Sequence, residues 1–149
     1  MGLDMYLNRR IYVENWDDNP IEEHIEVTLK KGGKKVKLNN PTYIIDQLMY
    51  WRKANSIHKW FVDNCGGGED NCEEIYVGKD SLRKLKEVIE KVLSDHNKAN
   101  ELLPTSSGFF FGGTEYDEWY FKDLSETLEV INEVLDDDIK GSITYQASW

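Results

Sequence analysis

Hydrophobic and polar positions alternate at the start of the chain. Across residues 3–13, Leu3, Met5 and Leu7 fall on one side, and mostly polar residues fall on the other. A period of two is typical of a strand that buries one face against a core, so we predict a first strand here. Turn-forming residues bound further segments of strand character at residues 25–31, 34–38, 73–78 and 143–146.

Helical spacing replaces this alternation elsewhere. Hydrophobic residues recur at intervals of three and four along residues 54–63, 80–94 and 114–136. Asp80 is the predicted N-cap of the second helix. Thr114 and Asp117 fit the capping box that begins the third helix. Residues 43–51 fit either a strand or the early part of the first helix.

Length and composition indicate one ordered domain. A chain of 149 residues is sufficient for one compact core. The chain is 40% hydrophobic and 31% charged, which excludes the composition of a disordered protein. Because the predicted strands and helices interleave, we expect a single α+β domain over residues 1–149, with an antiparallel sheet and about three helices.

The net charge of −10 argues against nucleic acid as a partner. Such a field repels polyanions unless a local basic patch overcomes it. The only such patch, residues 30–37, places five lysines around Gly32 and Gly33, and a solvated hairpin tip explains it more economically. No window approaches the roughly eighteen apolar residues that a membrane-spanning helix needs. We therefore expect a cytoplasmic protein without a membrane partner.

Residues 107–121 contain seven aromatic residues, three glycines and three carboxylates within fifteen positions. Rigid ring faces, closely approaching backbone and hydrogen-bond acceptors are what a ligand-recognition surface needs. Phe110 and Tyr116 are candidates to stack on a ligand, and Glu115 is a candidate to accept hydrogen bonds from it. Hydroxyl groups suited to a hydrogen-bonding rim belong to Thr105, Ser106 and Ser107.

A second dense feature begins at Trp51. If this segment is helical, Trp51, Asn55 and His58 share one face beside an apolar stripe. His58 is a candidate general acid or base, or a phosphate ligand, because imidazole titrates near neutral pH. The alternative is a buried histidine paired with a backbone carbonyl. Arg52 and Lys53 suit a phosphate or a carboxylate, with ordinary surface ion pairing as the alternative.

Carboxylate chemistry is a further hypothesis for the aromatic segment. Glu115 and Glu118 lie three residues apart and would share a helix face, whereas the cap already accounts for Asp117. No nucleophile, metal-ligand set or phosphate loop accompanies them. The spacing of Cys65 and Cys72 matches neither a zinc knuckle nor a redox pair. The sequence therefore predicts no metal and no cofactor.

Several of these motifs resemble a family of small acidic bacteriophage proteins. The matching runs are MGLDMYL at residues 1–7, YWRKAN at 50–55, IH at 57–58, WF at 60–61, LPT at 103–105, SGFFFG at 107–112, TEYDE at 114–118 and the C-terminal SW. Ala147 stands where the family pattern prefers a serine. The family has no established activity, so the resemblance implies a phage origin and a function in infected bacteria.

These observations lead to one functional hypothesis and two alternatives. We expect a pocket where the predicted helix at residues 51–61 meets residues 107–120, binding a nucleotide or a nucleotide-derived host defence signal in the bacterial cytoplasm. Its predicted binding residues are Trp51, Arg52, Lys53, Asn55, His58, Thr105, Ser107, Phe110, Thr114, Glu115 and Tyr116. An enzyme using His58 and Glu115 as acid and base is one alternative. A surface that inhibits a host protein is the other, and the oligomeric state stays open.

Overall fold

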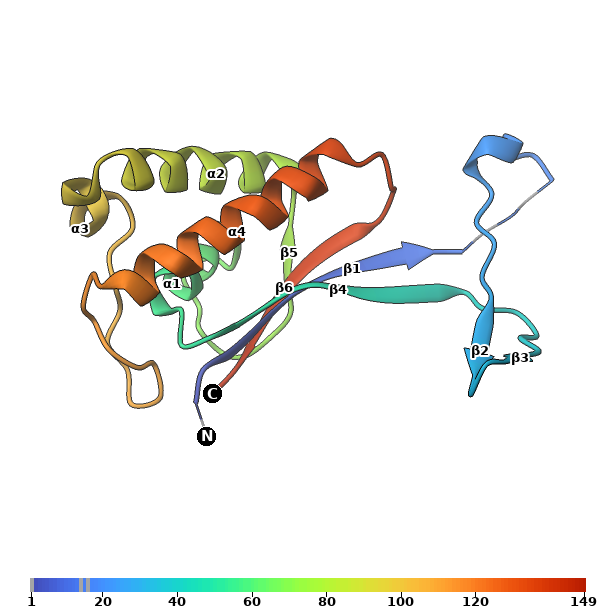
Figure 1. Cartoon of the computed structure of the whole chain (residues 1–149), viewed down its shortest axis with the longest axis horizontal. Helices are drawn as coiled ribbons and strands as arrows, with labels where there is room; N and C mark the ends of the chain where they lie inside the picture. Colours follow the sequence, from blue (N-terminus) through green and yellow to red (C-terminus); the bar gives the residue numbers. More distant parts are fainter. Residues whose placement is uncertain (1, 14, 16) are drawn as a thin grey trace.

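An antiparallel four-stranded sheet forms the base of the structure (Figure 1). The computed structural model describes residues 2–13, 15 and 17–149. The strands of this sheet are β1 (Asp4–Tyr12), β4 (Tyr43–Arg52), β5 (Ile75–Val77) and β6 (Ser142–Ser148). Their order is β4-β1-β6-β5, so the N-terminal strand pairs with both β4 and the C-terminal strand.

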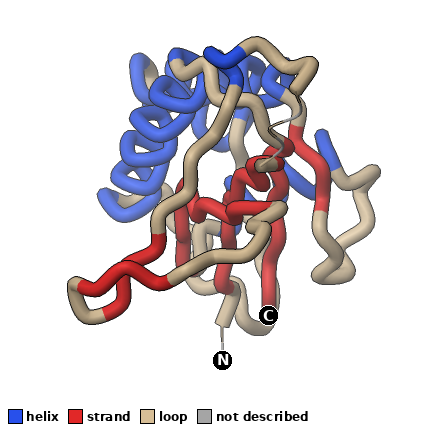
Figure 2. Tube along the Cα trace, turned by 90° about the vertical axis from the view of Figure 1, so that its right-hand side faces the viewer, coloured by secondary structure: helices blue, strands red, loops and turns tan. Residues whose placement is uncertain are grey.

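The helices gather on one face of this sheet (Figures 1 and 2). They are α1 (Asn55–Cys65), α2 (Lys79–Ser94), the short α3 (Ala99–Leu102) and α4 (Glu118–Asp136). Short 3-10 helices occupy Ile21–Glu23 and His96–Lys98. Helices α2 and α4 pack against each other along their length. The predicted single α+β architecture is thus confirmed.

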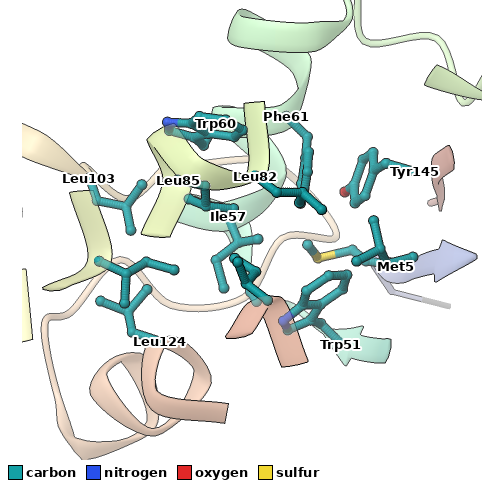
Figure 3. Close-up of a cluster of buried hydrophobic side chains, with 14 of the residues drawn as sticks. Met5, Trp51, Ile57, Trp60, Phe61, Leu82, Leu85, Leu103, Leu124 and Tyr145 are labelled. Carbon is teal, nitrogen blue, oxygen red and sulfur yellow. The ribbon is translucent and has the colours of Figure 1, made fainter. Parts of the chain in front are cut away.

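The alternation in β1 has the predicted physical consequence. Leu3, Met5 and Leu7 are each at most 1% exposed and face the helices. The apolar stripe of α2 is buried as its spacing predicts, mainly against α4. Figure 3 shows the aromatic part of this core, where Phe61 stacks on Tyr145 with ring centroids 4.3 Å apart. Burial of one face of the sheet under amphipathic helices is therefore the main source of stability.

A second, two-stranded sheet lies at the far end of the long axis, away from the helices (Figure 1). It consists of β2 (Leu29–Lys31) and β3 (Lys34–Val36). Gly32 and Gly33 have φ angles of +57° and +79°, the left-handed pair that a two-residue hairpin turn requires. The predicted hairpin is confirmed, with strands shorter than its hydrophobic pattern indicated.

Three boundaries differ from the sequence predictions. Trp51 lies in β4 opposite Met5, so it does not share a helix face with Asn55 or His58. Helix α2 begins at Lys79 rather than after Asp80. Helix α4 begins one residue after Asp117, and no capping box extends back to the threonine predicted to begin it. Strand pairing with β1 sets the position of Trp51, whereas the side chain of Asp117 caps α4 and sets its first residue. Among the described residues, no helix is both long and apolar enough to cross a bilayer.

Candidate functional site

A cleft of about 320 Å³ opens where the turn from β4 into α1 faces the segment around the start of α4. Its volume is at the lower end of the range for small-molecule sites. One wall comes from residues 52–56, and the other comes from the loop and helix between residues 105 and 123. The lining residues are Arg52, Lys53, Ala54, Asn55, Ser56, Thr105, Gly112, Gly113, Glu115, Asp117, Trp119, Tyr120 and Asp123.

Two cations stand at the first wall. Arg52 ends β4, and Lys53 occupies the left-handed region with φ 60°, which turns the chain sharply into α1. The Lys53 amide donates to the carbonyl of Leu3 at 2.8 Å, and the Asn55 amide donates to the carbonyl of Lys53 at 2.9 Å. These bonds hold the first turn of α1 at the cleft, where its partial positive charge adds to that of the two side chains.

Asn55 joins the two walls. Its Nδ2 atom donates to the carbonyls of Phe111 at 3.0 Å and Gly113 at 2.8 Å, and its Oδ1 atom accepts from the Ser106 amide at 2.9 Å. The side chain therefore makes three hydrogen bonds to the protein, and the residue is only 3% exposed. Asn55 was predicted to bind ligand; it lines the cleft, and its amide also fixes the loop of residues 106–113 against α1.

Carboxylates line the second wall. Glu115, Asp117 and Asp123 all face the cleft, and within the described residues none of them forms an ion pair. Asp117 caps α4 through a 3.0 Å bond from the Tyr120 amide to its Oδ1 atom. Partial burial raises the pKa of Asp123 to about 6, and the nearby Glu126 carboxylate adds to the shift. This wall is thus rich in hydrogen-bond acceptors.

Trp119 supplies the exposed ring of the cleft. It lies in the first turn of α4 and is 64% exposed, with the Lys122 ammonium 5.4 Å from its ring centroid. Trp119 and Asp123 line the cleft but were not among the predicted site residues. Trp119 and Asp123 lie four residues apart in α4 and therefore share one side of the helix. Had the start of α4 been predicted at Glu118, this spacing would have indicated that both residues face the same surface.

Several predicted binding residues stabilise the second wall of the cleft through hydrogen bonds. The Thr105 hydroxyl donates to the carbonyl of Thr114 at 2.9 Å. The Tyr116 hydroxyl accepts from the Thr105 amide at 3.2 Å and donates to Asn100 Oδ1 at 3.1 Å. Thr105 lines the cleft. Four other predicted binding residues of this region lie outside its lining, namely Ser107, Phe110, Thr114 and Tyr116.

Trp51 and His58 lie in the interior instead of the cleft. Trp51 is 3% exposed, and its Nε1 atom donates to Thr127 Oγ1 at 2.7 Å. Its position within the core is visible in Figure 3. The ring that was expected to stack on a ligand is therefore packed against α4 in the core.

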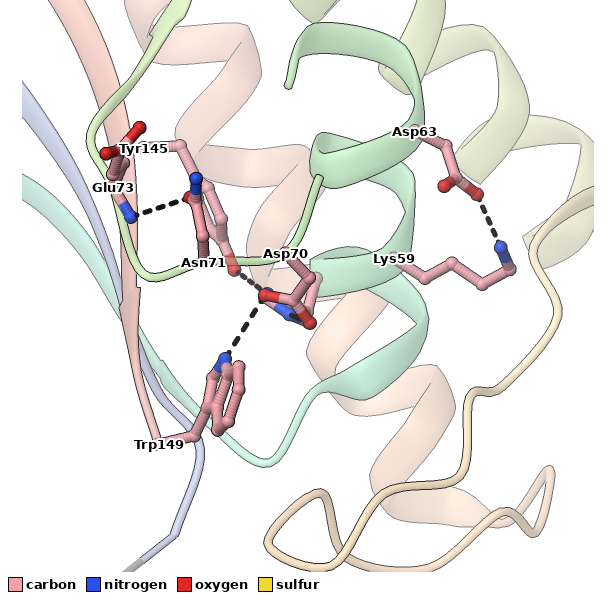
Figure 4. Close-up of polar contacts among 8 residues, drawn as sticks. Lys59, Asp63, Asp70, Asn71, Glu73, Tyr145 and Trp149 are labelled. Atoms are coloured by element: carbon pink, nitrogen blue, oxygen red, sulfur yellow. Dashed lines mark hydrogen bonds and ion pairs between the residues drawn. The ribbon is translucent and has the colours of Figure 1, made fainter. Parts of the chain in front are cut away.

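His58 is 2% exposed and bonded at both ring nitrogens. Nδ1 lies 2.6 Å from the Tyr145 hydroxyl and Nε2 lies 2.9 Å from Asp70 Oδ2. Asp70 also accepts from Trp149 Nε1 at 3.1 Å, which secures the C-terminus (Figure 4). The buried histidine expected as the alternative is therefore present, but its ring pairs with two side chains and not with a backbone carbonyl.

The surroundings of His58 separate it from the proposed acid–base partner. It lines a second cavity of only about 10 Å³ together with Asp70 and Tyr145, whereas Glu115 lines the large cleft. The structure does not bring His58 and Glu115 to one cavity. An acid–base pair built from these two groups has no shared space for a substrate.

Comparison with known protein families, curated protein sequences and solved structures found no match to this chain.

Proposed function

We propose that this protein is a phage accessory protein that binds and sequesters a nucleotide or a nucleotide-derived signalling molecule in the cleft. The observation that carries the proposal is the separation of unpaired charge. Arg52 and Lys53 line one wall, three carboxylates line the other, and no ion pair joins them among the described residues. Opposite charges held apart across a cleft fit a ligand with an anionic end and a hydrogen-bond-donating end.

The cationic wall suits the phosphate end of such a ligand. A guanidinium group forms paired hydrogen bonds to phosphate oxygens, and an ammonium group adds a mobile point charge. Arg52 and Lys53 supply one of each, beside the first turn of α1. The chain has a net charge of −10, so this local cationic wall is also what would draw an anion to this site rather than to the general surface.

The acidic wall suits the base. An ionised carboxylate only accepts hydrogen bonds, and the edges of nucleobases present N–H donors. Glu115 and Asp123 are placed to accept them, while the exposed ring of Trp119 offers a stacking face. Stacking of a base on an aromatic side chain contributes about 1–3 kcal/mol. Binding, rather than a reaction, is the function that this arrangement supports.

A calorimetric titration tests the proposal. Mononucleotides, cyclic mononucleotides, cyclic dinucleotides and ADP-ribose would each be titrated into the full-length protein. We expect at least one to bind, and Arg52→Ala to weaken that ligand about 10- to 100-fold, since a hydrogen bond to a charged group contributes roughly 1.5–3 kcal/mol. Trp119→Ala should weaken it similarly. Arg83→Ala is the matched control, because Arg83 pairs only with Asp80 on the exposed side of α2.

The same ligand should also raise thermal stability. Ligand at about 100 times its dissociation constant adds about 2.7 kcal/mol, which corresponds to several degrees in Tm for a chain of this length. The absence of any heat and of any Tm shift across the whole panel would rule out the proposed ligand class.

One observation favours a second candidate function, inhibition of a host protein. Phe109 is 95% exposed at the tip of the loop between α3 and α4, in edge contact with Phe110 at 4.8 Å between centroids. A projecting aromatic ring is a typical anchor of a protein interface. Recovery of one defined bacterial protein by the wild type, but not by Phe109→Ser, would favour this function. Unchanged recovery by the variant would remove it.

A further inference from the structure

The far end of the molecule carries two exposed segments of opposite charge. The lysine hairpin, residues 29–37, contains five lysines and no acid. The acidic loop, residues 17–26, contains five acids and no lysine or arginine. All ten charged side chains are exposed. Both segments lie at the end of the long axis that is remote from the α-helices (Figure 1).

These two segments do not neutralise each other within one chain. In the described part of the chain, none of the five lysines forms an ion pair, and Glu23 is the only one of the five acids that does, with Lys140 at 2.7 Å. The acidic loop is closed on itself by two 2.9 Å bonds between the Asn15 side chain and the backbone of Ile25.

The lysine hairpin also carries an internal electrostatic cost. Lys30 stands directly opposite Lys35, and Lys31 stands directly opposite Lys34. Like charges in directly opposed positions destabilise a strand pair. An anionic surface docked on the hairpin would remove this cost.

Exposed hydrophobic side chains accompany the charges. Ile21 in the acidic loop is 77% exposed, and Leu29 and Val36 in the hairpin are 46% and 41% exposed. Leu29 and Val36 are directly opposed and therefore share one face of the hairpin. A partner that covered this end would bury apolar area while pairing charge, which is the usual anatomy of a protein interface.

We infer that this end of the molecule is a self-association surface, on which the lysine hairpin of one copy docks on the acidic loop of a second copy. A two-fold symmetric interface uses the same patch on both subunits, so the patch must complement itself. Five positive and five negative side chains at one end meet that requirement, because the lysines of each copy can pair with the acids of the other copy. The two helical bodies, which carry the excess negative charge, then lie at opposite ends of the dimer, so their mutual repulsion is reduced by distance and by salt.

Sedimentation velocity on the full-length protein tests this inference. We expect a mass of two chains at about 0.05 M NaCl and dissociation toward the monomer at about 0.5 M, since exposed charge pairs are screened by salt. Two variants each reverse charges in one of the two segments. The first carries Lys30→Glu and Lys35→Glu in the hairpin, and the second carries Glu22→Lys and Glu26→Lys in the loop. Each variant alone should raise the dimer dissociation constant at least about tenfold.

A mixture of the two variants is the decisive measurement. In the mixed dimer, the unchanged loop of the hairpin-reversed copy faces the unchanged hairpin of the loop-reversed copy, and the two reversed segments face each other with opposite charges. Because both contacts are then complementary, a mixture should form heterodimers where neither variant forms homodimers. Lys84→Glu with Lys98→Glu makes the same charge change on the exposed body and should leave the wild-type behaviour unchanged.

Three results would overturn the inference: a monomeric wild type at all salt concentrations, a mixture that does not associate, or an equal effect of the body control. A wild-type monomer that instead binds a 20-nucleotide single-stranded DNA through the lysine hairpin would also overturn it, in favour of a nucleic-acid site.

Discussion

The side-chain amide of Asn55 lies 2.8 Å from the carbonyl oxygen of Gly113 and donates a hydrogen bond to it. This bond connects the first residue of α1 to a loop that is 58 residues further along the chain. Both residues line the cleft, so the width of the cleft depends on a bond that no local sequence pattern encodes.

Replacing Asn55 by Ala should release this loop. Two backbone carbonyls and the Ser106 amide lose their buried partner, and each unsatisfied group costs about 1–3 kcal/mol unless water reaches it. We expect faster amide hydrogen exchange across residues 106–113 and a free energy of unfolding lower by about 2 kcal/mol. Asn64→Ala is the control, since Asn64 makes one local bond to the Trp60 carbonyl on the same helix. Equal exchange in both variants would contradict the role of Asn55.

Removal of the Tyr145 hydroxyl should destabilise the fold without touching the cleft. His58 Nε2 faces the Asp70 carboxylate, so a neutral ring places its proton there and accepts from Tyr145 at Nδ1. Tyr145→Phe leaves that nitrogen buried without a donor, and the free energy of unfolding should fall by about 1–3 kcal/mol in urea denaturation. Tyr76→Phe, on the neighbouring strand and 69% exposed, should have no measurable effect. Ligand affinity should stay unchanged in both variants.

Asp123 should make stability depend on pH in the mildly acidic range. Its pKa is raised from the ordinary 3.8 to about 6, so the folded protein binds this proton more tightly than the unfolded chain does. The contribution of protonated Asp123 to the free energy of unfolding is therefore fully present below about pH 4 and is lost as pH rises through about 6. After allowance for solvent screening, we expect a loss of about 1–2 kcal/mol across this window.

Asp123→Asn isolates this contribution. Urea denaturation of the wild type and the variant from pH 4 to pH 7 should show the decline only in the wild type, once the shared slope of the other carboxylates is subtracted. Glu129→Gln, an exposed change on the same helix, should keep the wild-type slope. A variant with an unaltered slope would mean that Asp123 titrates normally.

Lys53 should show a conflict between stability and binding. Its left-handed backbone costs a non-glycine residue roughly 1–2 kcal/mol. Lys53→Gly should therefore raise the free energy of unfolding by up to about 1 kcal/mol, because glycine adopts this conformation freely but loses more entropy on folding. The same change should weaken the proposed ligand. Lys53→Ala removes the charge but keeps the strain, so it should weaken binding without raising stability.

The sequence by itself determined the type of most segments, strand or helix. The period of two in β1 and the stripe of α2 each bury the face that their spacing defines, because the burial of one apolar face depends on local periodicity. Gly32 and Gly33 likewise determined the hairpin turn, since both need positive φ. The segment 43–51 stayed ambiguous, because its run of mixed apolar residues fits both periods.

Tertiary structure alone decided which of the candidate residues face the cleft. Trp51 entered the core because its register opposite Met5 directs its ring toward α4. Trp119 stayed exposed because α4 begins only after the Asp117 cap. Adjacent aromatic residues look alike in sequence, and what separates a buried ring from an exposed one is the packing of elements far apart along the chain.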